Sequence, residues 1–165
     1  MRVPRRLDPE RIAEHLPRLY RAARSWTSSR EEAEDLVQET FARVLARPRF
    51  VRDEDEMGYL VRALRNTLIS QRRAAQRRPQ TIELDEELAA DTRGGDDPAE
   101  AAEHREVYTA IAGLPDEFRD ALVAVDVAGL SYEETARLLG VPEGTVTSRL
   151  YRARDRVARR LSGSE

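Results

Sequence analysis

Arginine side chains dominate the last part of the chain, where apolar residues recur at helical spacing. Residues 143–161 contain six arginines against only Glu143 and Asp155, a net charge of plus 4. A guanidinium group is always charged and donates two parallel hydrogen bonds to a phosphate or to the edge of a guanine. This segment is therefore suited to binding a polyanion such as DNA. Its arginines are Arg149, Arg152, Arg154, Arg156, Arg159 and Arg160.

The residues directly ahead of this segment predict a helix and a tight turn, which would present the segment to DNA. Ser131 followed three residues later by Glu134 is a capping box, which predicts a helix that begins at about Tyr132. Gly140 tolerates the left-handed conformation that commonly ends a helix, and Pro142 suits the first turn of a second helix of about 18 residues. Two helices joined by a tight turn are typical of helix-turn-helix DNA readers. An arginine-rich, solvated helix of a bundle is the alternative interpretation.

Composition limits the other classes of function. The chain has 165 residues and no cysteine, which allows one ordinary domain or two small ones and excludes a disulfide framework. His15 and His104 stand apart, and no zinc motif, phosphate-binding glycine loop or cysteine nucleophile is present, so we expect no catalytic residue, metal or cofactor. No apolar run approaches the roughly 20 residues that span a bilayer, and no signal peptide is evident. We expect a cytoplasmic protein without membrane insertion.

Charge is segregated along the chain, although the net charge is only minus 3. Residues 56–78 carry plus 5 and residues 79–106 carry minus 8. Like charges together with Gly94, Gly95 and Pro98 discourage a packed core in the acidic stretch. We therefore predict a flexible acidic linker at 79–101, between an N-terminal domain at 1–78 and a C-terminal domain at 102–165. The linker could also fold back over either basic neighbour.

Helical periodicity runs through the N-terminal domain, and no strand pattern competes with it. Asp8 and Pro9 predict a helix over 9–25, and the capping box of Ser29 and Glu32 predicts another over 30–46. A third apolar stripe begins at Met57 and runs into an arginine cluster.

The C-terminal domain is also expected to be helical. A short helix should precede Pro115, which opens another that ends at Gly129. The expected fold class is all-α, with two small helical domains joined by the flexible acidic linker. Inward-facing positions expected from helical spacing include Ile12, Leu16, Leu19, Ala23, Leu36, Phe41, Leu45, Thr145, Val146, Leu150, Val157 and Leu161.

Three segments together resemble bacterial sigma-70 family RNA polymerase sigma factors of the extracytoplasmic-function (ECF) group. They are EEAEDLVQETFARVLAR at 31–47, GYLVRALRNTLISQRRA at 58–74, and the stretch from LPDEF to RDRV at 114–157. The resemblance covers nearly the whole chain. It implies that the N-terminal domain is region 2, a helical bundle that binds core polymerase and opens the minus-10 element. It implies that the C-terminal domain is region 4, a helix-turn-helix that reads the minus-35 element.

Region 2 residues acquire expected roles from this resemblance. The acidic face of the second helix should dock on the polymerase clamp helices, whereas a merely solvated face is the alternative. Its residues are Glu34, Asp35, Gln38 and Glu39. The loop after that helix and the third helix should contact minus-10 DNA through an aromatic ring, guanidinium groups and one amide. These residues are Phe50, Arg62, Arg65, Asn66, Arg72 and Arg73. A simple hinge is the alternative interpretation of the loop.

The resemblance also assigns expected roles to region 4 residues at the start of the recognition helix. The candidates for minus-35 contact are Glu143, Gly144, Thr145, Thr147, Ser148, Arg149, Tyr151 and Arg152. Ser148, Tyr151 and Arg152 are the expected base readers, whereas Arg149 and Arg154 are expected on phosphates.

The resemblance also implies the partners. They are core RNA polymerase, through its clamp helices and flap, and promoter DNA. ECF factors are often held inactive by an anti-sigma factor, which joins the candidate partners. The implied function is promoter-specific transcription initiation. The alternative is an autonomous helix-turn-helix regulator that acts without polymerase.

Overall fold

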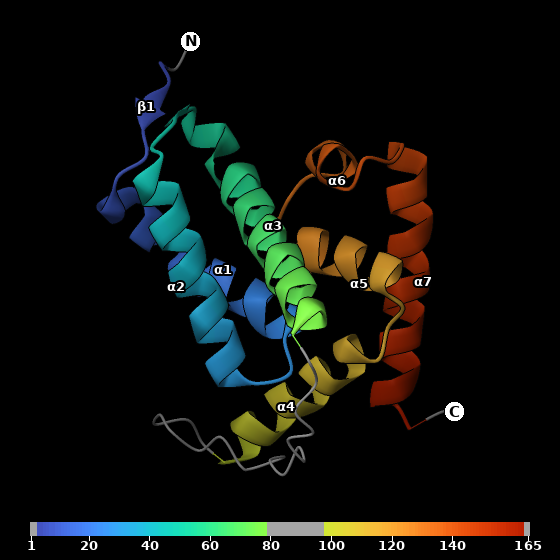
Figure 1. The fold of residues 1–165 in the computed structure, drawn as a ribbon. Helices are drawn as coiled ribbons and strands as arrows, with labels where there is room; N and C mark the ends of the chain where they lie inside the picture. Colours follow the sequence, from blue (N-terminus) through green and yellow to red (C-terminus); the bar gives the residue numbers. More distant parts are fainter. Residues whose placement is uncertain (1–2, 79–97, 164–165) are drawn as a thin grey trace.

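The structure, a computed structural model, describes residues 3–78 and 98–163. Figure 1 shows α1, α2 and α3 packed together in one half of the molecule and α5, α6 and α7 in the other. Helix α4 contacts both α1 and α7. The elements of the first half are β1 (Arg5–Arg6), α1 (Pro9–Trp26), α2 (Arg30–Ala46), β2 (Phe50–Val51), the 3-10 turn η1 (Asp53–Asp55) and α3 (Glu56–Arg77). Those of the second are α4 (Pro98–Ala112), α5 (Asp116–Leu122), the π-helical turn η2 (Val123–Val127), α6 (Tyr132–Leu139) and α7 (Glu143–Leu161).

The predicted all-α class is confirmed, with one small exception. Strands β1 and β2 form an antiparallel pair in which Arg5 lies opposite Val51 and Arg6 opposite Phe50. The expectation that no strand would form was therefore wrong at this place. Segments of two residues carry no periodicity, and their pairing joins positions far apart in the sequence.

Local capping explains why several helices begin and end where the sequence predicts. Ser131 accepts a hydrogen bond from the Glu134 amide at 3.1 Å, and the Glu134 carboxylate accepts one from the Ser131 amide at 2.7 Å, so this capping box is complete. Gly140 adopts a φ of 66° and ends α6. Ser29 likewise caps α2, but the Glu32 carboxylate accepts from the amide of Ser28 and not from that of Ser29.

The apolar core is built from the inner faces of the helices, and nine of the twelve expected inward positions named above are buried or half-buried. Three predictions were wrong, because the side chains of Leu16, Leu45 and Leu161 are 40%, 37% and 45% exposed. Spacing of three and four residues marks a wide stripe, but the neighbouring helices cover only part of it. The largest fully buried side chains include Leu7, Ile12, Leu19, Leu36, Leu60, Leu64, Val123, Val146 and Leu150.

A carboxylate joins the two halves. Asp120 in α5 accepts a hydrogen bond from Trp26 Nε1 at 3.0 Å, through Oδ1. Its Oδ2 accepts two more from the guanidinium of Arg65 in α3, at 2.9 and 3.2 Å. The Arg24 guanidinium also lies over the ring of Tyr108 in α4, 4.8 Å from its centre. The halves therefore pack against each other through polar contacts as well as through a shared apolar cluster.

The predicted linker falls mostly on residues 79–97, which lie outside the described residues. Helix α4 begins at Pro98 and so includes positions 98–101, which we had expected to belong to the linker. The idea that the acidic stretch folds back over a basic face concerns the same undescribed segment.

Candidate nucleic-acid and polymerase interfaces

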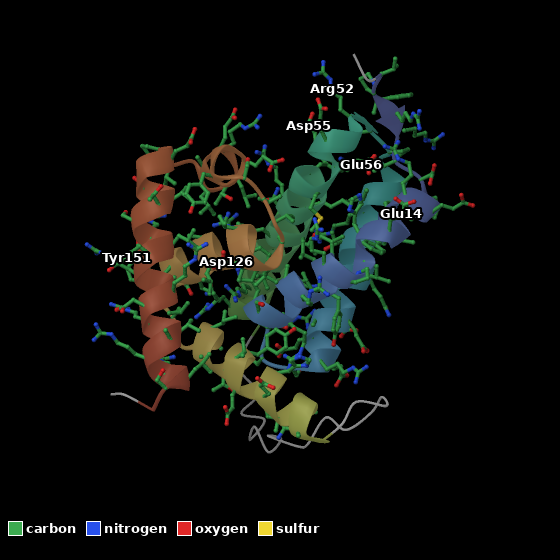
Figure 2. All side chains as sticks on the ribbon, turned by 180° about the vertical axis from the view of Figure 1, so that it is seen from behind. Glu14, Arg52, Asp55, Glu56, Asp126 and Tyr151 are labelled. Atoms are coloured by element: carbon green, nitrogen blue, oxygen red, sulfur yellow. The ribbon has the colours of Figure 1, made fainter. Side chains whose placement is uncertain are left out.

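Helix α7 is held by one face and presents the other to solvent. Val146, Leu150 and Ala153 are at most 1% exposed and face the rest of the C-terminal half. Figure 2 shows Tyr151 projecting outward from α7, and its side chain is 75% exposed. The other predicted base readers, Ser148 and Arg152, are also exposed. The packing of α7 therefore leaves these three side chains at the surface.

The predicted minus-35 set is brought together at the beginning of this helix. Glu143, Gly144 and Thr147 are exposed, whereas Thr145 is half-buried. Arg149 is also half-buried, because its guanidinium lies 3.2 Å from the Glu117 carboxylate of α5. Arg149 would have to share or leave this acid to contact a phosphate.

Arg154, the second expected phosphate contact, is paired as well. Its Nε and Nη2 donate to the two carboxylate oxygens of Asp126, at 2.9 and 2.7 Å. These hydrogen bonds raise the pKa of Arg154 above its already high usual value. The group is charged at every physiological pH, so the pairing affects its position and not its charge.

Two further arginines of α7 are used to build the fold. Arg160 donates to the carbonyl oxygens of Ala110 and Gly113, at 3.2 and 3.1 Å, and so satisfies the C-terminal end of α4. The guanidinium of Arg156 lies 4.9 Å from the centre of the Phe118 ring. Sequence reasoning placed all six arginines in one basic surface and missed these structural roles. The partners are distant in sequence, so no local signal identified them.

Helix α3 divides the predicted minus-10 residues between two faces. Arg62, Asn66 and Arg73 are exposed. Arg65 and Arg72 turn towards the end of α1: Arg65 pairs with Asp120, and Arg72 donates to the carbonyl oxygen of Trp26 at 3.0 Å. Arg72 is exposed as well, but of these five side chains only Arg62, Asn66 and Arg73 could meet DNA without a change in these contacts.

The beginning of α3 is fixed by a buried acid. Glu56 is 5% exposed, its carboxylate lies against the Arg11 guanidinium, and one oxygen is 2.9 Å from His15 Nε2. Burial lowers the pKa of His15 below its usual value, and the nearby charge of Arg18 lowers it further. Figure 2 shows Glu56 near Arg52 and Asp55, at the end of the molecule where the predicted DNA loop lies. This cluster, which sequence reasoning did not single out, holds the beginning of α3 against α1.

On α2, the predicted polymerase face is largely solvent-exposed, but some of its side chains already have a hydrogen-bond or ion-pair partner. Glu34 pairs with Arg30 at 3.1 Å, and Glu39 pairs with Arg43 at 2.6 Å and accepts a hydrogen bond from the Gln71 amide. Further residues of this face, Asp35 and Gln38, are exposed and have no hydrogen-bond or ion-pair partner within the part of the chain that the structure describes. They are the side chains most available to a partner.

Across 3–78 and 98–163, no cluster of histidine, aspartate and glutamate could hold a metal ion. No helix in the same ranges is long and apolar enough to cross a membrane.

Comparison with known families matches both halves of the chain. The sigma-70 region 2 model matches residues 11–78, and the sigma-70 region 4 model matches residues 104–157. The ECF RNA polymerase sigma factor SigM of Mycobacterium tuberculosis is 37% identical over 151 residues, which cover 89% of this chain and 73% of SigM. SigE of Mycolicibacterium smegmatis is 33% identical over 159 residues, which cover 90% of this chain but only 59% of SigE.

Solved structures show the same arrangement of helices. The sigma factor RpoE of Bartonella quintana, solved with the anti-sigma factor NepR, superposes with a TM-score of 0.68 at 26% identity, over 94% of this chain and 97% of RpoE. CnrH, solved with the cytosolic domain of CnrY, gives a TM-score of 0.64 at 22% identity, over 94% of this chain and 88% of CnrH, which supports the fold alone.

These matches confirm the resemblance drawn from the sequence, and they place the chain among transcription initiation factors and not among enzymes. The chain belongs to the sigma-70 family of RNA polymerase sigma factors, in its extracytoplasmic-function group.

Proposed function

We propose that this chain binds core RNA polymerase and directs it to promoters by recognising minus-35 and minus-10 DNA. The observation that carries this proposal is the presence, in one chain, of matched region 2 and region 4 segments with an exposed recognition helix. The protein would act in the cytoplasm, where polymerase and chromosome meet. An anti-sigma factor is a further proposed partner, since the similar RpoE was solved with one.

The proposed polymerase contact is the exposed acidic face of α2. Asp35 and Gln38 would contribute most, because Glu34 and Glu39 already have partners on their own helix or on α3. A carboxylate that faces a basic partner helix gains a charge-assisted hydrogen bond. Asp35→Ala and Gln38→Ala should each weaken core binding and leave helicity unchanged. Ala42→Ser, an exposed change on the same helix that removes no polar group, is the matched control.

We propose that the promoter contacts are divided between α3 and α7. Arg62, Asn66 and Arg73 would follow the melted minus-10 strand, and Phe50 would contact an unstacked base. Arg65 would contact this strand only if its guanidinium left the Asp120 carboxylate and bound a phosphate instead. In α7, Ser148, Tyr151 and Arg152 would read the minus-35 element. Residues 1–78 and 102–165 would act as two separate regions.

The test combines binding with initiation. The purified chain is mixed with sigma-free core polymerase, and the complex is separated by gel filtration and assayed on a promoter library. We expect a stable complex and transcripts that begin at sites sharing a minus-35 and a minus-10 element. Tight binding to duplex DNA without polymerase, together with failure to bind an active core from a related bacterium, would instead support an autonomous regulator.

A further inference from the structure

An aspartate of the turn ahead of α6 holds one arginine of α7 in a fixed orientation. The Nε and Nη2 groups of Arg154 donate to the two carboxylate oxygens of Asp126, at 2.9 and 2.7 Å. Two parallel hydrogen bonds of this kind fix both the position and the plane of a guanidinium group. Figure 2 shows Asp126 beside α7, while Tyr151 projects from the outer side of that helix. The side chain of Arg154 is therefore oriented in the absence of DNA.

The π-helical turn η2 explains how Asp126 reaches this place. In a regular α-helix, residue 126 would share a face with Leu122 and Val123, which are both buried. In η2 the Ala128 amide instead donates to the Val123 carbonyl oxygen, five positions earlier, at 2.8 Å, and Asp126 lies at the surface. Such π-helical turns occur frequently at functional sites. The wider turn thus directs an acid away from the core and towards α7.

Arg154 retains donors for a second partner. A guanidinium group has five N–H donors, and the Asp126 carboxylate occupies two of them. The other donors, on Nη1 and Nη2, point away from the carboxylate. The side chain of Arg154 is 52% exposed, so the group is accessible to a partner. Arg154 can therefore bind a phosphate while it stays paired with Asp126.

The place of Arg154 on α7 suits a phosphate at the side of a DNA groove. Residues three and four positions apart are neighbours on a helix surface, so Arg154 follows Thr147 and Tyr151 along one side of α7. Thr147 and Tyr151 are exposed members of the predicted minus-35 set. Contacts with phosphates fix the register and orientation of a protein on a duplex but carry no sequence information. A guanidinium held at this side would thus determine how α7 lies in the groove.

We propose that Asp126 is a positioning residue for DNA binding, which holds Arg154 so that its remaining N–H donors bind a backbone phosphate beside the minus-35 element. A side chain that is already held loses less conformational freedom on binding than a mobile one. The idea deepens the proposed function and rests on α7 being the helix that contacts DNA. Removal of an acid near DNA ordinarily lessens repulsion and strengthens binding. If Asp126 positions Arg154, its removal should instead weaken binding.

The experiment measures binding of a fluorescein-labelled duplex of about 20 base pairs by anisotropy, at about 50–200 mM salt. The duplex can have any sequence, because a phosphate contact is independent of sequence. The full chain is measured alone and in complex with core polymerase. Arg154→Ala should weaken binding about three- to tenfold and reduce the slope of log K against log salt by about 0.9, the change for one phosphate contact on duplex DNA.

Asp126→Asn should weaken binding about two- to fivefold, because an amide offers the guanidinium one acceptor oxygen in place of two. In the Arg154→Ala background the same change should cause no further weakening, since the two residues act as a unit. Asp116→Asn is the matched control, because it removes the same charge from the same half of the molecule, where this acid pairs with Arg119 of α5. The control should bind as tightly as the wild type or slightly more tightly.

Arg154→Lys tests the same step without altering η2. The charge is kept but the two parallel hydrogen bonds are lost, so binding should weaken about two- to fivefold. Circular dichroism checks that each variant is folded.

The proposal is overturned if Asp126→Asn binds the duplex as tightly as Asp116→Asn or more tightly, since Asp126 would then withhold Arg154 from DNA. It is also overturned if Asp126→Asn weakens binding equally with and without Arg154, if Arg154→Lys retains wild-type affinity, or if the wild-type chain binds no duplex in either form. Failure of the wild-type chain to bind core would refute the proposed function. The result for Asp126 on the chain alone would still hold, because an autonomous regulator would also use α7 on DNA.

Discussion

Helix α7 and helix α3 with its C-cap Arg78 each contain six arginines, but the two sets are used differently. In α7, five of the six contact an acid, a carbonyl oxygen or an aromatic ring of the C-terminal half. Arg152 alone has no such partner within the described residues. In α3, Arg62 and Arg73 are exposed and have no hydrogen-bond or ion-pair partner among the described residues, whereas Arg65 and Arg72 each have one.

The number of arginines in a helix is therefore a poor guide to how many of its guanidinium groups remain without a partner among the described residues. Helix α7 is as rich in arginine as α3, yet four of its six guanidinium groups contact α4, α5 or η2. Positional accuracy matters for reading bases, because a bidentate contact requires a fixed geometry. Contacts with phosphates require less positional accuracy, since a guanidinium without a partner can adjust to the DNA backbone. We therefore expect specificity to depend on few residues of α7 and affinity to depend on several of α3.

The largest effect should come from Arg152→Ala. Loss of a bidentate contact with a base should cost about 1–3 kcal/mol and relax discrimination at one minus-35 position. Transcription by the reconstituted holoenzyme on matched and mismatched minus-35 sequences measures this. Arg62→Ala provides the comparison, because loss of a phosphate contact should weaken all sequences alike. Equal weakening of matched and mismatched promoters by Arg152→Ala would show that Arg152 does not read a base.

A somewhat smaller effect is expected from Asp120→Ala, which removes the contact between the halves. Trp26 Nε1 and the Arg65 guanidinium would lose their shared acceptor, at a cost of about 1–2 kcal/mol after allowing for partial exposure of the ion pair. Urea denaturation measures the loss. The same variant removes the acceptor of Arg65, so this guanidinium should join Arg62 and Arg73 among the free basic groups of α3. Asp116→Ala, which removes an exposed acid one turn away whose ion pair among the described residues is with Arg119, is the control.

Arg160→Ala separates structural arginines from DNA-binding ones. Its hydrogen bonds to the end of α4 should contribute about 1 kcal/mol to the free energy of unfolding. Arg159→Ala removes the same charge from the same turn, but it breaks only an exposed i,i+4 pair with Asp155, at about 0.3–0.5 kcal/mol. Melting temperatures of the two variants should differ in this order. Equal stability would mean that the arginines of α7 do not position it.

Local signals in the sequence predicted most helix boundaries. The capping box of Ser131 and Glu134 and the left-handed Gly140 depend only on neighbouring residues, so they could be read directly. Helix α2 likewise occupies the predicted residues 30–46. Most residues of the candidate faces on α2 and at the beginning of α7 are solvent-exposed, as a binding role requires, although their assigned contacts stay predictions.

Features that depend on distant residues could not be read in this way. Nothing in the vicinity of Asp120 indicates that it would meet Trp26 and Arg65, because these lie more than 50 positions away in the sequence. The β1–β2 pair and the burial of Glu56 beside Arg11 arise from the same kind of long-range contact. The sequence of an arginine-rich helix gives its charge, but contacts with neighbouring elements determine which of its guanidinium groups remain available to a partner.

The smallest predicted effect is a pH dependence confined to the first half of the molecule, where His15 contacts Glu56. Burial and Arg18 lower the pKa of His15 in the folded state. The unfolded chain therefore binds more protons as the pH falls through about 6.5, so folding stability should decrease with falling pH in that window. His15→Gln, which keeps a side-chain amide beside Glu56, should reduce this decrease. Melting temperatures of both chains between about pH 7.5 and 5.5 measure the difference, and parallel curves would show that His15 titrates alike in the folded and unfolded states.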